Sequence, residues 1–119
     1  MRYIKDSKRS LLLKTENIQR ITGMIGFARR AGKTVIGTDL ICRAMPKGEI
    51  EVVVISASAS DSTKKKLTTK SEFYGIHSIE AGLDTECLGS ILGKSGAVAA
   101  VAITDKGLAD EIKKAAVSQ

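Results

Sequence analysis

Aromatic residues are scarce in this sequence. Two Tyr, two Phe and no Trp occur among its 119 residues. Stacking of single-stranded bases on aromatic side chains is therefore not expected to be the main binding mode of the protein. The core must be aliphatic, and a chain of this length suits one domain that buries roughly two thirds of its extended-chain surface.

Cysteine and histidine are rare as well. The chain has two cysteines, Cys42 and Cys87, and one histidine, His77. Their spacing fits neither a disulfide framework nor a zinc site, so both cysteines are interpreted as small core residues. General acid–base catalysis requires titratable groups that meet in a pocket, and His77 has no evident partner. We expect a binding protein rather than an enzyme, with no catalytic residue, metal or cofactor.

Long hydrophobic runs are also missing. The longest uninterrupted apolar stretch covers residues 97–103, about a third of the roughly 20 residues that a membrane-spanning helix needs. The apolar cluster at residues 11–13 is too short for the apolar region of a signal peptide. These patterns predict a cytoplasmic protein without a membrane partner.

Acidic residues are few in the first part of the chain. Residues 1–47 hold 11 basic and three acidic side chains, whereas residues 48–119 hold eight basic and ten acidic ones; the two parts carry +8 and −2, which sum to the formal charge of +6. This asymmetry favours a polyanion as partner. A basic tail joined to an ordinary solvated surface would give the same count, so the charge alone leaves both interpretations open.

The spacing of apolar residues divides the chain into alternating helices and strands. Residues 1–14 show no sustained periodicity and are interpreted as a basic N-terminal extension, followed by a single domain over residues 15–119. Thr38 or Asp39, Ser60, Asp84 and Asp105 are candidate helix caps. The order predicts a three-layer α/β/α sandwich. Helices are expected near residues 18–32, 38–46, 60–75, 84–92 and 105–115, and strands near residues 34–36, 51–56, 76–81 and 97–103.

Two Gly-Lys pairs invite comparison with a phosphate-binding P-loop, which needs four residues between its first Gly and the Gly-Lys pair. Five residues separate Gly26 from Gly32, and three separate Gly89 from Gly93. We therefore expect no nucleotide hydrolysis and no small-molecule substrate. Gly89 is interpreted instead as a position at which its helix packs closely against a neighbour.

The start of the second predicted helix is the strongest local candidate for a binding site. Gly37, Thr38 and Asp39 mark this start, where backbone amides and the helix dipole attract a phosphate or an electron-rich base edge. Arg43 lies one turn after Asp39, so an acceptor and a forked donor could address the same base step. The alternative interpretation is that Asp39 caps the helix and pairs with Arg43 at the surface.

Five segments, taken together and in order, resemble a known family. They are residues 23–33 (GMIGFARRAGK), 37–39 (GTD), 61–66 (DSTKKK), 88–93 (LGSILG) and 102–107 (AITDKG). The resemblance is to the kink-turn RNA-binding ribosomal protein superfamily of the L7Ae and L30e type, in particular its bacterial YlxQ-like branch, and it runs from about residue 18 to residue 115. It implies an α/β/α sandwich with a small, about four-stranded mixed sheet.

The resemblance also implies a function: a non-enzymatic protein of the translation machinery that recognises structured RNA, either kink-turn-like or ribosomal. We expect it to be a monomer. In the family, the N-terminus of the second helix and the loop before the fourth helix grip the bend of a kink-turn. The resemblance implies a helix site formed by Gly37, Thr38, Asp39 and Arg43. It implies a loop site formed by Ala81, Gly82 and Leu83, in which Leu83 packs against an unstacked nucleotide. The implied phosphate contacts are Lys33, Lys64 and Lys65.

Four positions depart from the family pattern. The family helix typically has Asn, then Glu, then Lys three residues later, where this chain has Asp39, Leu40 and Arg43. An acidic residue that is usual after the second strand is replaced by Ser58. These departures leave an alternative function open, a protein-interaction module on the same fold that has lost specific RNA binding.

Overall fold

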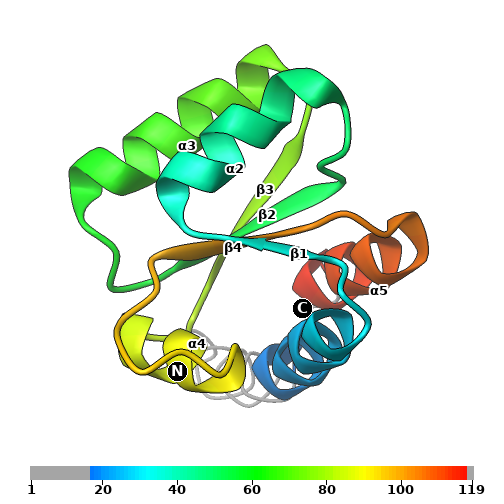
Figure 1. Ribbon diagram of the computed structural model, residues 1–119, viewed down its shortest axis with the longest axis vertical. Helices are drawn as coiled ribbons and strands as arrows, with labels where there is room; N and C mark the ends of the chain where they lie inside the picture. The colour runs from blue at the N-terminus through cyan, green and yellow to red at the C-terminus, as the bar shows by residue number, and fades with distance from the viewer. Residues whose placement is uncertain (1–16, 118–119) are drawn as a thin grey trace, which may run out of the picture.

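The computed structural model describes residues 17–117 (Figure 1), so the predicted extension over residues 1–14 lies outside the described residues. The expected alternation of helices and strands is present. An N-terminal helix covers residues 17–30 and is followed by β1 (Thr34–Ile36), α2 (Thr38–Ala44), the 3-10 turn η1 (Met45–Lys47), β2 (Val52–Ser56), α3 (Asp61–Phe73), β3 (His77–Ala81), α4 (Thr85–Ile91), β4 (Ala100–Ile103) and α5 (Lys106–Val117).

The four strands form one mixed sheet in the order β1-β4-β2-β3. β2 and β3 are parallel, whereas β4 is antiparallel to both β1 and β2. Consequently β1, β2 and β3 run in the same direction and end at the same side of the sheet, where β4 begins. We call this side the common edge.

Helices cover both faces of the sheet (Figure 1), which confirms the predicted three-layer α/β/α sandwich. The N-terminal helix, α4 and α5 pack on one face, and α2 and α3 pack on the other. β2 is buried along its whole length because its alternate residues enter the two cores: Val52 and Val54 join the first, Val53 and Ile55 the second.

Three of the predicted helix caps are confirmed. The side-chain oxygens of Ser60, Asp84 and Asp105 accept backbone N–H groups three residues further on, at 3.2, 2.7 and 2.9 Å respectively. Each cap satisfies one of the N–H groups that the first turn of a helix leaves without an intrahelical partner.

The predicted cap of α2 is wrong. Neither Thr38 nor Asp39 caps this helix: the N-cap is Gly37, whose carbonyl accepts the N–H of Ile41 at 3.0 Å and whose φ is 101°. A glycine is needed because this backbone angle is unfavourable for residues with a Cβ. The sharp turn from β1 into α2 thus places both Thr38 and Asp39 inside the first helical turn.

Two other expectations are corrected. Cys87 is exposed on α4 and is not a core residue, while Cys42 is partly buried against the second core. β4 begins at Ala100 rather than at residue 97, because its partners end there: Ile36 pairs with Val101 and Ile55 with Ala100.

Candidate functional site

The common edge brings the two predicted binding segments to the same side of the molecule. Gly37 follows β1 and Gly82 follows β3, and both strands end at this edge. β4 and β2 lie between them in the sheet, so three interstrand spacings separate the segments by roughly 14 Å. Residues 45 positions apart in sequence therefore border one surface.

A series of hydrogen bonds ties the two segments together across the edge. The N–H of Gly37 donates to the carbonyl of Ala100 at 3.1 Å, and the N–H of Ser56 donates to the carbonyl of Ala99 at 2.8 Å. The hydroxyl of the same Ser56 donates to the carbonyl of Leu83 at 2.7 Å. The end of β2 and the start of β4 therefore hold the two segments at a fixed separation.

Two serines that the sequence did not single out as site residues complete this arrangement. Ser56 is buried, and its Oγ also accepts the N–H of Ser58 at 3.2 Å. The Oγ of Ser58 accepts the N–H of Thr85 at 2.9 Å, which joins the loop after β2 to the first turn of α4. A hydroxyl at the end of an otherwise apolar buried strand is the signal that could have identified Ser56, since a buried polar group needs a partner.

The helices α2, α3 and α4 begin at the common edge, and they differ in what accepts the backbone N–H groups of their first turns. Side-chain oxygens cap α3 and α4, whereas no side chain in the described part of the chain caps α2. The first-turn amides of α2, beginning with Thr38, therefore face the edge without a side-chain acceptor. Amides of this kind, at the positive end of a helix dipole, favour a phosphate oxygen or another acceptor.

The predicted surface pair between Asp39 and Arg43 is not formed. An Asp39 carboxylate oxygen lies 4.0 Å from the Nζ of Lys66 on α3, and both side chains remain largely exposed. Such an exposed pair contributes little to stability, so Asp39 stays available as an acceptor. Arg43 is exposed in the last turn of α2 and belongs to none of the ion pairs found among residues 17–117.

The segment after β3 exposes its backbone rather than its side chains. Gly82 is exposed, but Ala81 and Leu83 on either side are buried, with only 6% of Leu83 accessible to solvent. The predicted packing of Leu83 against a nucleotide is therefore wrong, because this side chain belongs to the first core. The surface that this segment offers a ligand is the main chain around Gly82.

The three predicted phosphate-contacting lysines lie in different surroundings. Lys33 precedes β1 and its carbonyl accepts the N–H of Thr104 beyond the end of β4, so it lies at the opposite edge of the sheet, about 13 Å of extended chain from Gly37. The Nζ of Lys64 lies 3.5 Å from a carboxylate oxygen of Glu80 on β3. Lys65 is exposed on α3. Among the three, Lys65 is thus the exposed cation on an element that starts at the common edge.

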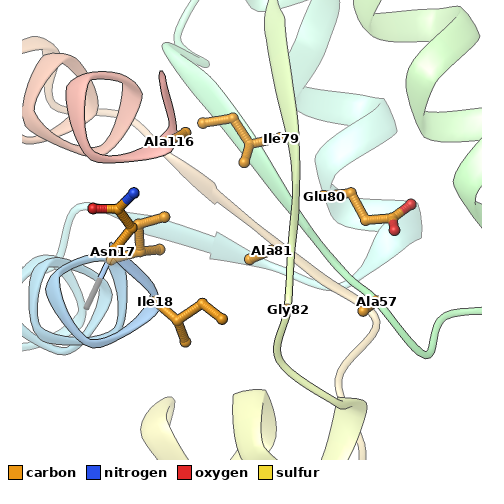
Figure 2. Close-up of a pocket in the computed structure, with 9 residues that line it drawn as sticks. Asn17, Ile18, Ala57, Ile79, Glu80, Ala81, Gly82 and Ala116 are labelled. Atoms are coloured by element: carbon orange, nitrogen blue, oxygen red, sulfur yellow. The ribbon is translucent and has the colours of Figure 1, made fainter. Parts of the chain in front are cut away.

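A cavity of about 310 Å³ lies beside Gly82, beneath β3 (Figure 2). Alternation along the strand directs Ile79 and Ala81 toward this cavity, whereas Glu80 points to the other side of β3, where it meets Lys64. A Cβ at position 82 would lie 2.8 Å from the Cδ1 of Ile18, so a glycine here allows the close approach of that side chain. The cavity is lined by Asn17, Ile18, Ile21, Ala57, Ile79, Glu80, Ala81, Gly82 and Ala116.

Titratable groups are dispersed rather than gathered at this edge. His77 is exposed at the start of β3, at the other end of that strand from Gly82. Within the described part of the chain, no group of three or more His, Cys, Asp or Glu side chains could hold a metal ion. The helices of that part are also too short or too polar to cross a membrane.

Comparison with known proteins gives a consistent set of relatives. The model of the ribosomal protein L7Ae/L30e/S12e/Gadd45 family matches residues 19–113. The RNA-binding protein YlxQ of Enterococcus faecium is 32% identical over 98 residues, which cover 82% of this chain and 92% of that protein. The RNA-binding protein YlxQ of Bacillus subtilis (strain 168) is 33% identical over 91 residues, which cover 75% of this chain and 87% of that protein.

Solved structures share the fold. A protein of unknown function from Bacillus halodurans C has a TM-score of 0.75 and 26% identity, with 81% of this chain and 95% of that chain covered. A 15.5kD RNA binding protein of Giardia lamblia has a TM-score of 0.72 and 16% identity, with 85% of each chain covered. The second of these, at its low identity, supports the architecture alone.

Proposed function

Since the chain belongs to the ribosomal protein L7Ae/L30e/S12e/Gadd45 family, we propose that it binds structured RNA and uses the common edge to do so. The RNA is kink-turn-like or ribosomal, and the protein acts in translation, in the cytoplasm and as a monomer. Its relatives in Enterococcus faecium and Bacillus subtilis are named as RNA-binding proteins, and each is at least 32% identical to it.

One observation supports the proposal above the others: the start of α2 and the segment around Gly82 border the same edge and are hydrogen-bonded to the strands between them. A folded RNA presents backbone and base edges as a shape, which a fixed pair of contacts can recognise. The amides that follow Gly37 offer donors, Asp39 offers acceptors for a base edge, and Arg43 offers a charged fork on the same helix.

The proposal is tested by titrating the full chain with two RNAs at two salt concentrations. One RNA has a kink-turn with tandem sheared G·A pairs, and the other is a matched duplex in which Watson–Crick pairs replace them. We expect tighter binding of the kink-turn. If about three to five phosphates are neutralised, the logarithm of the binding constant should fall with the logarithm of salt concentration with a slope of about −2 to −4.

Arg43→Ala tests the contact surface, and Arg20→Ala is its matched control because Arg20 is exposed on the opposite layer. Arg43→Ala should weaken kink-turn binding roughly tenfold and duplex binding much less, as expected for a base contact worth about 1–3 kcal/mol. Arg20→Ala should leave both affinities near the wild-type values. Equal losses of affinity for the two RNAs would mean that Arg43 contacts only phosphates.

A second candidate function is a protein-interaction module, and the exposure of Leu40 favours it. This side chain is 54% exposed on α2, one turn before Arg43 and at the position where the family typically has Glu. An exposed leucine contributes to a protein interface more readily than to a base edge. Absence of binding to either RNA would support this function over RNA recognition.

A further inference from the structure

The most exposed large hydrophobic side chain of the described region is at the far end of α3. Phe73 is 80% exposed, and Tyr74 beside it is 40% exposed. Their rings meet edge to face, with centroids 4.9 Å apart and planes at 88°. The contact with Tyr74 restrains the phenylalanine ring while leaving most of its surface open. A planar, restrained and exposed ring is a surface on which a base can stack.

Two lysines precede this ring on the same face of the helix. Lys66, Lys70 and Phe73 are spaced by four and three residues, so their side chains follow one line of about 10 Å along α3. Both lysines are exposed, and Glu72 belongs by its spacing to the neighbouring line with Lys65. The arrangement therefore presents positive charge followed by an aromatic ring.

This line starts next to the proposed RNA surface. Lys66 lies 4.0 Å from Asp39 in the first turn of α2, and α2 and α3 lie side by side on the same face of the sheet (Figure 1). α3 begins at the common edge and runs away from it for 13 residues, about 20 Å. An RNA strand that leaves the common edge over α3 would pass Lys66 and Lys70 before it reaches Phe73.

We propose that this face of α3 binds single-stranded RNA that continues from the structured element held at the common edge, with Lys66 and Lys70 contacting its phosphates and Phe73 stacking on a base. The inference rests on the proposed function, because it extends the same RNA surface. Charge followed by an exposed ring is the combination that binds single strands without reading their sequence. Phe73 accordingly adds affinity and little sequence preference.

The test compares the kink-turn RNA with versions that have eight additional unpaired adenosines at the 5′ or at the 3′ end. A further version has an abasic extension, which keeps the phosphates and removes the bases. We expect one of the two adenosine extensions to tighten binding by about tenfold, within the range measured for one base stacked on an aromatic side chain. Two neutralised phosphates should also steepen the logarithmic salt slope by about 1.4.

Variants separate the two contributions. Phe73→Ala should remove most of the tenfold gain while leaving the affinity for the unextended RNA unchanged, and Phe73→Tyr should retain the gain. Phe27→Ala is the matched control, because Phe27 is a 55% exposed phenylalanine on the opposite layer. Lys66→Gln combined with Lys70→Gln should return the salt slope to that of the unextended RNA.

The outcomes distinguish this inference from the proposed function. Equal affinity for extended and unextended RNA, or a gain that neither Phe73→Ala nor the abasic extension reduces, would overturn the α3 contact and leave binding at the common edge intact. Failure of the unextended kink-turn RNA to bind would overturn the proposed function and, with it, the inference.

Discussion

Gly89 and Gly23 form a pair of helical glycines for which the same substitution should have opposite effects. Replacing glycine by alanine within a helix stabilises it by about 1 kcal/mol when the new methyl group meets nothing. A Cβ at Gly23 in the N-terminal helix would meet nothing within 4 Å among residues 17–117 apart from the backbone of its own helix and the adjoining residues. Gly23→Ala should therefore raise the free energy of unfolding by about 0.5 to 1 kcal/mol.

At Gly89 the methyl group would collide with the main chain. The position of its Cβ overlaps the carbonyl oxygen of Gly96 and lies 3.2 Å from the carbonyl carbon. No side-chain rotation relieves a contact with backbone, so α4 or the turn around Gly96 must move. Overpacking typically costs about 1–3 kcal/mol, and a collision with main chain belongs in the upper part of that range, about 2–3 kcal/mol. After the gain of about 1 kcal/mol in helix propensity is subtracted, Gly89→Ala should have a net loss of about 1–2 kcal/mol.

Urea denaturation followed by circular dichroism measures both changes on the same scale. The two variants should differ by about 1.5–3 kcal/mol in free energy of unfolding, at unchanged dependence on urea. The reasoning would be refuted by a Gly89→Ala protein as stable as the wild type, or by a Gly23→Ala protein that is destabilised to the same extent.

Three further substitutions have defined expectations. Gly37→Ala should lower the free energy of unfolding by about 1–2 kcal/mol in urea denaturation, because its φ of 101° is unfavourable for alanine although no atom obstructs the methyl group; an unchanged stability would contradict this backbone assignment. Ser71→Ala should raise stability by about 1 kcal/mol, since its buried hydroxyl has no hydrogen-bond partner among residues 17–117, and a loss of stability would indicate one. Lys65→Gln should weaken RNA binding and lower the magnitude of its salt slope by about 0.9. Lys64→Gln should change the affinity and the slope less, because Lys64 already pairs with Glu80. A larger effect of Lys64→Gln than of Lys65→Gln would show that Lys65 does not contact the RNA.

Local features of the fold were predictable from the sequence. The strand expected near residues 51–56 is β2, and its continuous apolar run over residues 52–55 is fully buried. Ser60 and Asp84 were identifiable as caps because their side chains and the helices that follow them are adjacent in sequence. The close packing expected at Gly89 is present, although its partner is the turn at Gly96 and not another helix.

Features that depend on long-range pairing were not predictable. Nothing local to β4 indicates that it inserts between β1 and β2, yet this position creates the common edge. The burial of Leu83 was not predictable either, because the sequence shows an apolar residue in a loop and does not show that the core lies beneath it. At the start of α2, the side chains of Thr38 and Asp39 can accept a capping hydrogen bond, which glycine cannot. The turn from β1 nevertheless requires the backbone freedom of Gly37, so glycine is the N-cap.

The hydrogen bonds across the common edge limit how far the protein itself can change shape when a ligand occupies this edge. The carbonyls of Ala99 and Ala100 accept the N–H groups of Ser56 and Gly37, and the hydroxyl of Ser56 donates to Leu83, so a shift of either contact segment would break these hydrogen bonds. A preorganised surface loses little conformational entropy when it is occupied. If the protein binds RNA as proposed, the adjustment in shape falls on the RNA, and binding stabilises the bent form of a flexible junction over its extended form.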